Sequence, residues 1–287
     1  MNNVKKLMLN SPLLIKHLNT LHNPPKQLYY RGELEDCLSQ PCLAIVGSRK
    51  LSQYGRAVTN KLAREASEQG ITIVSGLALG MDGVAHQAAI DARGKTIAVL
   101  PSGLDKIYPA SHHHLANQLI DSGGALVSEY ESSSTYAFKG NFIARNRIIS
   151  ALSDAVLLIE ATTGSGSLHT AGFAKEQGKL LLAVPGPITS PQSEGTNNLI
   201  KQGAIPITNV NDILSAMGMK RKLTGPKLLG DTPEQTVLLQ LIYDGVSNSS
   251  ALLAASKLDL QIFNQTLTML EITGKISPVG PGQWGLS

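Results

Sequence analysis

Six short apolar runs, each separated from the next by helical or loop residues, constrain the fold of this chain more than any other feature. The runs are rich in Val, Ile and Leu and do not alternate with polar residues, as expected of strands that are buried on both faces. They comprise residues 43–46, 71–74, 96–100, 125–127, 155–159 and 180–184. Helical patterns lie between them at residues 55–69, 82–92, 112–122 and 167–177. This β-α alternation predicts an α/β fold, a doubly wound parallel sheet of extended Rossmann-like type.

Glycines mark the ends of the helical patterns. Each falls just past the last helical residue, where a residue in the left-handed region commonly ends a helix. These glycines are Gly70, Gly94, Gly123 and Gly178. Their regular placement supports the same fold prediction.

The composition of the sequence changes on either side of residues 42–217, which form the predicted Rossmann-like sheet domain. Residues 1–41 are too short for an independent domain and are expected to pack on the sheet. Residues 218–230 include the basic stretch Lys220–Lys222 and are predicted to form a linker. Residues 231–287 predict three helices and a terminal hairpin, the layout of a small winged-helix domain.

The third predicted helix of this C-terminal segment, at residues 259–271, would be its recognition helix. One face carries the apolar residues Leu260, Phe263, Leu267 and Leu270. The rest of the helix offers Gln261, Asn264, Gln265 and Thr268, with no Arg or Lys. A protein contact or a structural role is therefore as well supported as DNA binding.

Composition narrows the partners and the compartment. The chain has 287 residues and a formal net charge of +4, a mild basic excess that is compatible with a polyanionic partner. Cys37 and Cys42 lack the spacing of a metal site and indicate a reducing compartment. The sequence shows no signal peptide and no apolar run of membrane-spanning length. We therefore expect a cytoplasmic protein that needs no membrane, metal or cofactor.

Small residues gather in the loops that follow several predicted strands. The carboxyl ends of parallel strands form the ligand site of doubly wound sheets. Glycine lets the backbone approach a ligand closely, and the amides at a helix N-terminus favour an anion. These loops therefore predict a phosphate site. Its candidates are Gly47, Ser48, Arg49, Ser75, Gly76, Ser165, Gly166 and Ser167, the last placed to begin a helix.

A second group of candidates lies just before the fifth predicted strand. Arg145 and Arg147 are two residues apart, so on a helix they face in different directions and one of them must point toward the core or a cleft. One interpretation is an internal salt bridge, since an unpaired buried guanidinium is costly. The other is a site for phosphates and bases, because Lys139, Phe142 and Asn146 are close in sequence.

Enzymatic alternatives have weaker support. A dinucleotide site needs Gly-x-Gly-x-x-Gly after the first strand and an acidic residue ending the second, and a P-loop needs Gly-x-x-x-x-Gly-Lys-Ser/Thr. The sequence contains none of these at the required places. Glu129 and Glu160 are the only plausible general bases, but the Pro-Gly-Gly-x-Gly-Thr loop that a nucleotide N-glycosidase would want is missing.

Several histidines have ordinary structural interpretations. Asp82 and His86 lie four apart on one predicted helix, but no nucleophile or metal-ligand set joins them in sequence. Asp82 is therefore expected to cap the helix and His86 to satisfy a buried partner. Residues 112–114, three consecutive histidines, are expected to be solvated, and His169 to line or support the glycine-rich loop.

The motifs, taken in order, resemble those of the bacterial DNA-processing protein A family (DprA, also called Smf). They are Val-Gly-Ser-Arg at 46–49, Ser-Gly-Leu-Ala-x-Gly-Met-Asp at 75–82, Tyr-Pro at 108–109, Ser-Glu-Tyr at 128–130, Arg-Asn-Arg-Ile-Ile at 145–149, Ser-Gly-Ser-Leu-x-Thr-Ala at 165–171, Val-Pro-Gly at 184–186 and Gly-Thr-Asn-x-Leu-Ile at 195–200. The likeness covers about residues 24–217, and the C-terminal segment is similar to the winged helix of some members. Members often carry an N-terminal helical domain for which residues 1–41 leave no room, so its functions are not expected here.

The resemblance implies a binding protein and not an enzyme. Members bind single-stranded DNA in natural transformation, protect it, help to load the RecA recombinase, and form dimers through the far edge of the sheet. The resemblance implies that residues 42–217 are the DNA-binding domain. The implied phosphate pocket comprises Gly47, Ser48, Arg49, Lys139, Phe142, Arg145, Asn146, Ser165, Gly166 and Ser167. The implied dimer edge contains Leu199, Ile200, Ile205 and Ile207. The alternative is a nucleotide phosphoribohydrolase-like enzyme on a related Rossmann-like fold.

Overall fold

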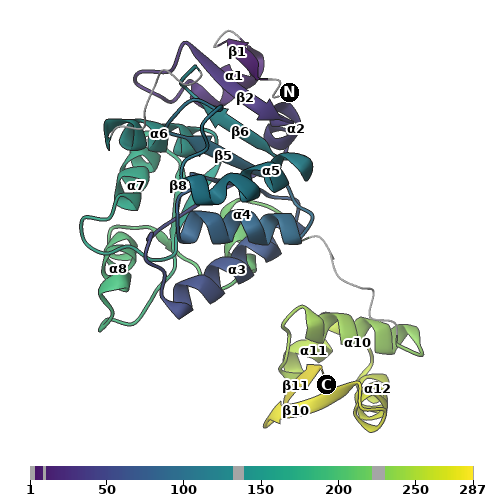
Figure 1. The fold of residues 1–287 in the computed structure, drawn as a ribbon. Coiled ribbons are helices and arrows are strands. Elements are labelled where there is room, and N and C mark those ends of the chain that lie inside the picture. Colours follow the sequence, from purple (N-terminus) through teal and green to yellow (C-terminus); the bar gives the residue numbers. More distant parts are fainter. Residues whose placement is uncertain (1–3, 9–10, 132–138, 222–229, 287) are drawn as a thin grey trace. The chain divides into compact units, whose positions relative to one another are not determined.

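The computed structural model describes residues 4–8, 11–131, 139–221 and 230–286. The chain divides into two compact units, residues 1–222 and residues 223–287 (Figure 1). The first unit contains a nine-stranded sheet with helices on both faces, and the second contains three helices and a two-stranded sheet.

Seven parallel strands form the body of the large sheet, in the order β6-β5-β4-β3-β7-β8-β9. They are β3 (Cys42–Val46), β4 (Thr72–Ser75), β5 (Thr96–Leu100), β6 (Ala125–Ser128), β7 (Ala155–Leu158), β8 (Leu180–Ala183) and β9 (Ile205–Pro206). The direction of strand succession reverses between β3 and β7, and doubly wound sheets bind their ligands at such a switch point. The predicted doubly wound fold is confirmed, and the sheet is mostly parallel where a wholly parallel one was expected.

The N-terminal residues extend this sheet at its β6 edge. Strand β2 (Gln27–Gly32) pairs antiparallel with β6, placing Tyr30 opposite Val127, and β1 (Lys5–Met8) pairs antiparallel with β2. Residues 1–41, expected to pack on the sheet, therefore supply two of its strands. Two short helices of the same segment bury Leu18, Leu34 and Leu38 in the core; they are α1 (Pro12–Leu18) and α2 (Leu34–Leu38).

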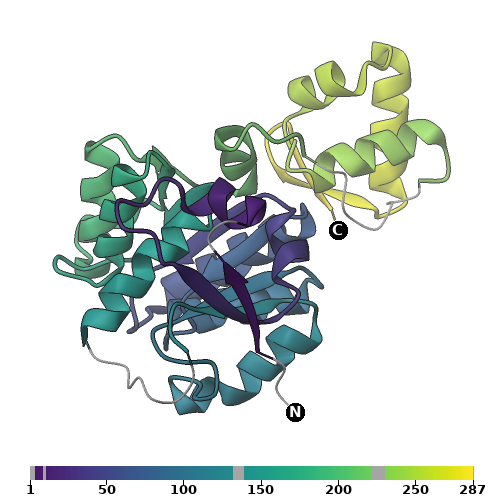
Figure 2. The same ribbon diagram turned by 90° about the horizontal axis from the view of Figure 1, so that it is seen from above.

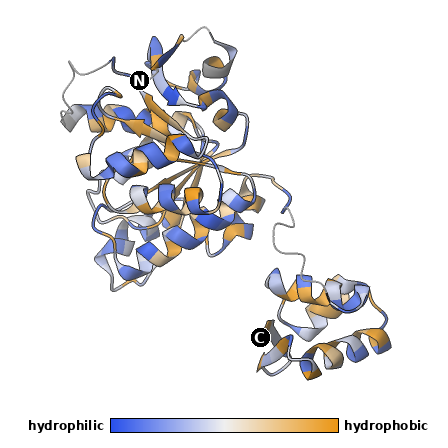
Figure 3. Cartoon of the chain, turned by 45° about the vertical axis from the view of Figure 1, so that its right-hand side comes forward, coloured by the Kyte–Doolittle hydropathy of each residue, from blue (hydrophilic) through white to orange (hydrophobic). Residues whose placement is uncertain are grey.

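Successive residues of the parallel strands are buried on opposite faces of the sheet. In β3, Ala44 and Val46 belong to one apolar cluster, whereas Leu43 and Ile45 belong to another. Helices α6 (Lys139–Ala151) and α7 (Ser167–Glu176) contribute to the first cluster, and α3 (Gln53–Glu68), α4 (Met81–Asp91) and α9 (Val210–Ala216) to the second (Figure 2). Because both faces are covered, the strands need no polar alternation. Figure 3 shows the apolar strands between helices with polar outer surfaces.

Two further helices pack near the sides of the sheet. Helix α5 (His113–Asp121) contacts β6 and follows a 3₁₀ turn at Ala110–His112, and α8 (Glu194–Lys201) contacts β8 and follows a 3₁₀ turn at Pro191–Ser193. Neither turn was expected from the sequence.

Three of the four predicted glycine stops are confirmed, because Gly70, Gly123 and Gly178 have φ values of 82°, 81° and 65°. Gly94 is different: the left-handed residue after α4 is Arg93, with φ 56°. A Cβ atom at Gly94 would lie 2.6 Å from the Cβ atom of Ser67. Glycine is therefore required at position 94 by the close approach of two segments and not by its backbone dihedral angles.

The second unit contains α10 (Pro233–Tyr243), α11 (Ser249–Ser256), α12 (Leu260–Ile272) and a hairpin of β10 (Ile276–Gly280) and β11 (Gln283–Leu286). Thr232 caps α10 as predicted, since its hydroxyl accepts a hydrogen bond from the Gln235 amide at 3.3 Å. Phe263, Leu267 and Leu270 are buried, but Leu260, expected on the same face, is 58% exposed. It is the first residue of α12, ahead of the part of the helix that packs in the core.

The remaining compositional expectations concern cysteines, membranes and metals. Cys37 and Cys42 are free and buried, and burial raises the pKa of the Cys37 thiol to about 12. Within the described ranges, no helix has the length and apolar character needed to cross a membrane. The same residues contain no group of three or more His, Cys, Asp or Glu side chains that could hold a metal ion.

Candidate nucleic-acid interface

A cavity of about 770 Å³ opens at the carboxyl ends of β3 and β7, where the strand succession reverses. Nine of the predicted binding residues line it, although they come from three segments far apart in the sequence. They are Gly47, Ser48, Arg49, Phe142, Arg145, Asn146, Ser165, Gly166 and Ser167. His169, expected to line or support the glycine-rich loop, also lines this cavity.

The turn after β3 places Arg49 at the cavity rim. The Ser48 hydroxyl donates to the Lys50 carbonyl at 2.8 Å and accepts from the Lys50 amide at 3.0 Å, which closes a tight turn. A side chain at Gly47 would collide with the Met81 side chain, so the turn can approach α4 only with glycine there. Arg49 and Lys50 are consequently exposed side by side.

Two aromatic rings stand next to Arg49. Its guanidinium carbon lies 5.3 Å from the centre of the Phe142 ring, a cation–π contact. The Phe142 ring in turn makes an edge-to-face contact with Tyr108, with centroids 5.4 Å apart and an interplanar angle of 73°. One wall of the cavity therefore combines a cation that can bind phosphate with rings on which bases can stack.

Tyr108 was missed as a site residue, although its Tyr-Pro motif was noted. It is 47% exposed and lines the cavity. It lies eight residues after the end of β5, at the same sheet edge as the other loops. Its position in a loop that follows a predicted strand was the sequence feature that could have identified it as a site residue.

Arg145 is buried, with 5% of its surface exposed, and its guanidinium donates hydrogen bonds to carbonyls near the ends of two strands. Its Nη1 atom donates to the Gly76 carbonyl at 2.5 Å and to the Val99 carbonyl at 2.6 Å, and Nε donates to Asn146 Oδ1 at 3.1 Å. Burial lowers its pKa to about 10, against the attraction of the Asp82 carboxylate, so the group remains charged at neutral pH. Arg145 therefore lines the cavity with its hydrogen-bonding groups directed largely to protein atoms.

Arg147 faces in another direction, as the two-residue spacing predicts. Its Nη2 atom is 2.6 Å from both carboxylate oxygens of Glu129, and Nη1 donates to the Asn23 carbonyl at 2.8 Å. The salt-bridge interpretation thus applies to Arg147, and the inward-facing arginine is Arg145.

Ser75 and Gly76, predicted as ligand residues, lie below the cavity and do not line it. The Ser75 hydroxyl is buried and donates to the Ile45 carbonyl at 2.7 Å. A side chain at Gly76 would collide with the Arg145 guanidinium. These two residues contact parts of the protein that border the cavity, and a contact of either one with a ligand remains a prediction.

Asp82 holds the loop before α4 and does not cap the helix as expected. Its Oδ2 atom accepts from the amides of Gly76 and Ala78 at 3.0 and 3.3 Å. Burial raises its pKa, opposed by the Arg145 charge. His86 has its expected buried partner, since Nδ1 lies 2.7 Å from the Thr96 hydroxyl, and burial lowers its pKa to about 3. His86 is therefore neutral under physiological conditions.

The loop after β7 provides the opposite wall. The hydroxyls of Ser165 and Ser167 are 2.8 Å apart, and the Asn146 side-chain amide donates to the Gly166 carbonyl at 3.3 Å. Ser167 begins α7 as predicted, so the first amides of a ten-residue helix lie at the cavity. The Leu168 and His169 amides already donate to the Ser165 and Gly166 carbonyls at 3.0 and 3.3 Å, so it is the positive end of the helix dipole that favours an anionic group there.

The two candidate general bases are both engaged elsewhere. Glu160 is 2% exposed, and its oxygens accept from the Ser52 hydroxyl at 2.5 Å and the Ser52 amide at 3.2 Å. Glu129 is the partner of Arg147. Neither lines the cavity. Lys139 begins α6, but its side chain lies outside the described residues.

The predicted dimer edge is only partly exposed. Ile205 lies on the edge strand β9 and is 38% exposed, Ile200 is half-buried, and Leu199 packs partly against the core. Ile207 is fully buried, so its expected exposure is wrong. Residues two apart in a strand point to the same face, which would place Ile205 and Ile207 together. Strand β9 ends at Pro206, however, so this rule does not apply to Ile207.

The structure is thus a doubly wound sheet with a cavity at its switch point that is lined by cationic and aromatic side chains. The chain belongs to the family of the DNA recombination-mediator protein A, whose model matches residues 6–218. Among its relatives, protein Smf of Escherichia coli K12 is 46% identical over 212 residues, which are 74% of this chain and 55% of that protein. The DNA processing protein DprA of Bacillus subtilis is 39% identical over 70% of this chain and 67% of its own.

Solved structures of the same family share this fold. DNA processing protein A of Streptococcus pneumoniae matches with a TM-score of 0.69 and 36% identity, covering 74% of each chain. The Helicobacter pylori protein, described for its single-stranded DNA binding mode, matches with a TM-score of 0.66 and 36% identity over 76% of this chain and 98% of its own. The chain spans 55% and 50% of the lengths of the Smf proteins of E. coli and Synechocystis.

Proposed function

We propose that this protein binds single-stranded DNA in the cytoplasm, independently of base sequence, and protects it during natural transformation and recombination. The proposal assigns no chemical step to the cavity, because both candidate general bases are engaged in other bonds. Family membership supports a role in DNA processing, and the H. pylori relative supports the choice of a single strand. Presentation of the bound strand to the RecA recombinase is proposed from the family resemblance alone.

The observation that carries the proposal is the wall formed by Arg49, Phe142 and Tyr108. A guanidinium can donate two hydrogen bonds to a phosphate, and this contact carries no sequence information. Aromatic rings stack on any base, but only on a base that is not already stacked in a duplex. Cation and rings in contact therefore suit a flexible strand whose phosphates and bases are both accessible.

Single-stranded DNA is expected to bind more tightly than a duplex of the same length, with affinity falling steeply as salt increases. Each phosphate that is neutralised on a single strand contributes a slope of about −0.7 to a plot of log K against log salt. Fluorescence anisotropy of labelled oligonucleotides at several salt concentrations measures both effects. Equal affinity for the two forms, or affinity that does not depend on salt, would contradict the proposal.

We also propose a symmetric dimer formed through the β9 edge. The edge strand leaves backbone groups unpaired and exposes Ile205 next to the half-buried Ile200. A two-fold axis there would give one assembly two cavities, which a single long strand could occupy together.

Light scattering is expected to give a dimer mass at protein concentrations of tens of micromolar. Ile205→Lys should shift the mass to that of a monomer, because it places a charge on the edge strand. Its affinity for long oligonucleotides should fall while that for short ones is retained. A monomer mass for the unaltered protein with intact DNA binding would refute the dimer.

The second unit is not proposed to read DNA, although its winged-helix layout remains our prediction. Residues 223–287 contain three lysines and five acidic residues. The exposed surface of α12 carries Gln261, Asn264, Gln265 and Thr268 together with the half-exposed Ile262 and Met269. An uncharged, partly apolar helix in an acidic unit is poorly suited to a phosphate backbone.

A further inference from the structure

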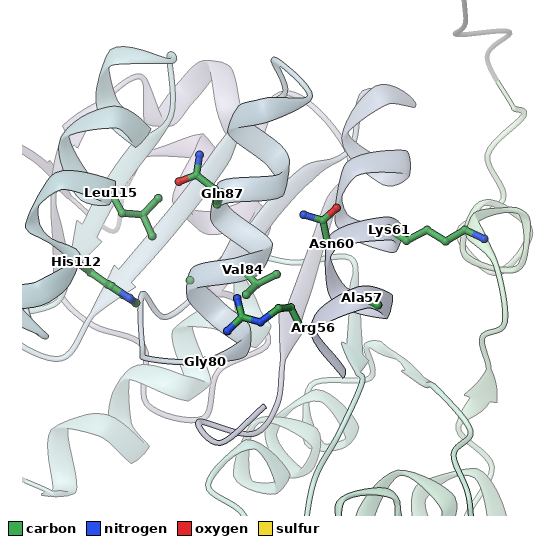
Figure 4. Close-up of a pocket in the computed structure, with 10 residues that line it drawn as sticks. Arg56, Ala57, Asn60, Lys61, Gly80, Val84, Gln87, His112 and Leu115 are labelled. Atoms are coloured by element: carbon green, nitrogen blue, oxygen red, sulfur yellow. The ribbon is translucent and has the colours of Figure 1, made fainter. Parts of the chain in front are cut away.

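A second hollow, of about 720 Å³, lies along α3 and α4 near the start of α5 (Figure 4). Arg56 and Asn60 of α3 point into it from one side, and His112 lies on the other side, beyond α4. Gln87 of α4 lies between them. None of the ten lining residues is acidic. We call this hollow the α3–α4 groove.

The position of His112 in this groove contradicts the expectation that residues 112–114 are all solvated. His112 is half-buried, and its Nδ1 atom is 2.9 Å from the Leu77 carbonyl. Because a carbonyl oxygen only accepts, Nδ1 carries the hydrogen of this bond. A Cβ atom at Gly83 would lie 2.8 Å from His112 Cε1, so glycine there leaves room for the ring. The imidazole is thus packed over α4 at a defined place in the groove.

The groove adjoins the cavity at the turn that carries Arg49. A Cβ atom at Gly80, a groove residue, would lie 2.5 Å from the Arg49 carbonyl oxygen, and the Met81 amide donates to the Ser48 carbonyl at 3.3 Å. The turn that carries Arg49 at the cavity therefore also contacts Gly80, which lines the groove. Its exposed Lys50 lies in sequence between Arg49 at the cavity and Arg56 at the groove.

We propose that the α3–α4 groove is a second phosphate subsite, which binds the continuation of the single strand held at Arg49. This rests on the proposed function. Arg56 provides the charge, while the side-chain amides of Asn60 and Gln87 can donate hydrogen bonds to phosphate or sugar oxygens, and the His112 ring forms the far wall. No Phe, Tyr or Trp side chain lines the groove, so we expect contacts there to be mainly with the backbone of the strand.

The test compares oligonucleotides of increasing length on the full-length chain. Arg56→Ala should leave the affinity for the shortest bound oligonucleotide unchanged and should reduce that for longer ones about 10-fold, the loss of one charge-assisted contact. The salt slope for the longer ones should become shallower by about 0.7. Asn60→Asp, which keeps the side-chain size and adds a negative charge, should produce a similar loss that depends on length.

Arg64→Ala is the matched control, because it removes one arginine from the same helix and Arg64 does not line the groove. It should leave both affinities within about 2-fold. Equal losses in Arg56→Ala and Arg64→Ala would overturn the groove assignment but not the proposed function. The same holds if Arg56→Ala and Asn60→Asp cause no loss while Arg49→Ala still weakens binding. If the unaltered protein bound no single strand at any length, the proposed function itself would fail and the groove assignment with it.

Discussion

Arg145→Ala is expected to destabilise the protein by about 3–5 kcal/mol, the usual effect of removing one partner of a buried charged network. The substitution leaves the carbonyls of Gly76 and Val99 without their donor and the buried Asp82 carboxylate without its cation. A loss of this size is a large fraction of the stability of an ordinary domain. Urea unfolding followed by circular dichroism measures it as a lower midpoint.

The control for this prediction is Arg147→Ala. Arg147 and Glu129 form a pair that is partly exposed to solvent, with side-chain exposures of 16% and 24%, so its removal should cost no more than about 1 kcal/mol. If Arg145→Ala unfolded at the same urea concentration as the unaltered protein but no longer bound DNA, this result would contradict the prediction. Arg145 would then contact the DNA directly and would not be a stabilising residue.

Arg49→Ala is expected to weaken single-strand binding by about 1.5–3 kcal/mol per site, roughly 10- to 150-fold in Kd. Arg49 is exposed at the tip of its turn, so unfolding should be little affected. Lys139→Ala should have a smaller effect, because a lysine acts mainly as a screened point charge. Titration of a labelled oligonucleotide measures both variants.

Two comparisons test whether DNA binding depends on the cavity itself. The first controls for the general positive charge of the protein, and the second for the contribution of the second unit. Arg64→Ala removes an exposed charge that is paired with Asp91 at 3.7 Å and should leave binding nearly unchanged. Deletion of everything after Met217 should weaken binding only through the loss of Lys220–Lys222. If the deletion abolished binding while Arg49→Ala had no effect, the second unit would be the DNA reader and the cavity would require another ligand.

The parallel part of the fold could be predicted because buried strands have a simple sequence pattern. Apolar runs such as residues 43–46 need no polar face when helices cover both sides of the sheet. The antiparallel edge could not be predicted, because residues 28–31 indicate an extended segment but not its partner β6. Arg93 in place of Gly94 was missed because a non-glycine residue in the left-handed region has no clear local signal.

The cavity could be predicted in outline because the ends of parallel strands always meet at one edge. Helical spacing showed that Arg145 and Arg147 diverge, but the choice between them depended on Asp82 and on carbonyls from two other strands. The α3–α4 groove could not be predicted, because Arg56 and His112 share no motif and are brought together only by the packing of α4 between α3 and α5.

The position of β3 also affects the order in which the chain can fold. β3 is a central strand whose second neighbour, β7, follows it by more than a hundred residues, and the Cys42 amide donates to Asp154 across 112 residues. A nascent chain that has emerged only as far as β6 therefore presents an apolar strand with one edge open. Such pairings between distant segments slow folding and prolong this exposure. Synthesis of this protein should accordingly depend on chaperones until β7 has left the ribosome, and fragments that end before Ala155 should aggregate.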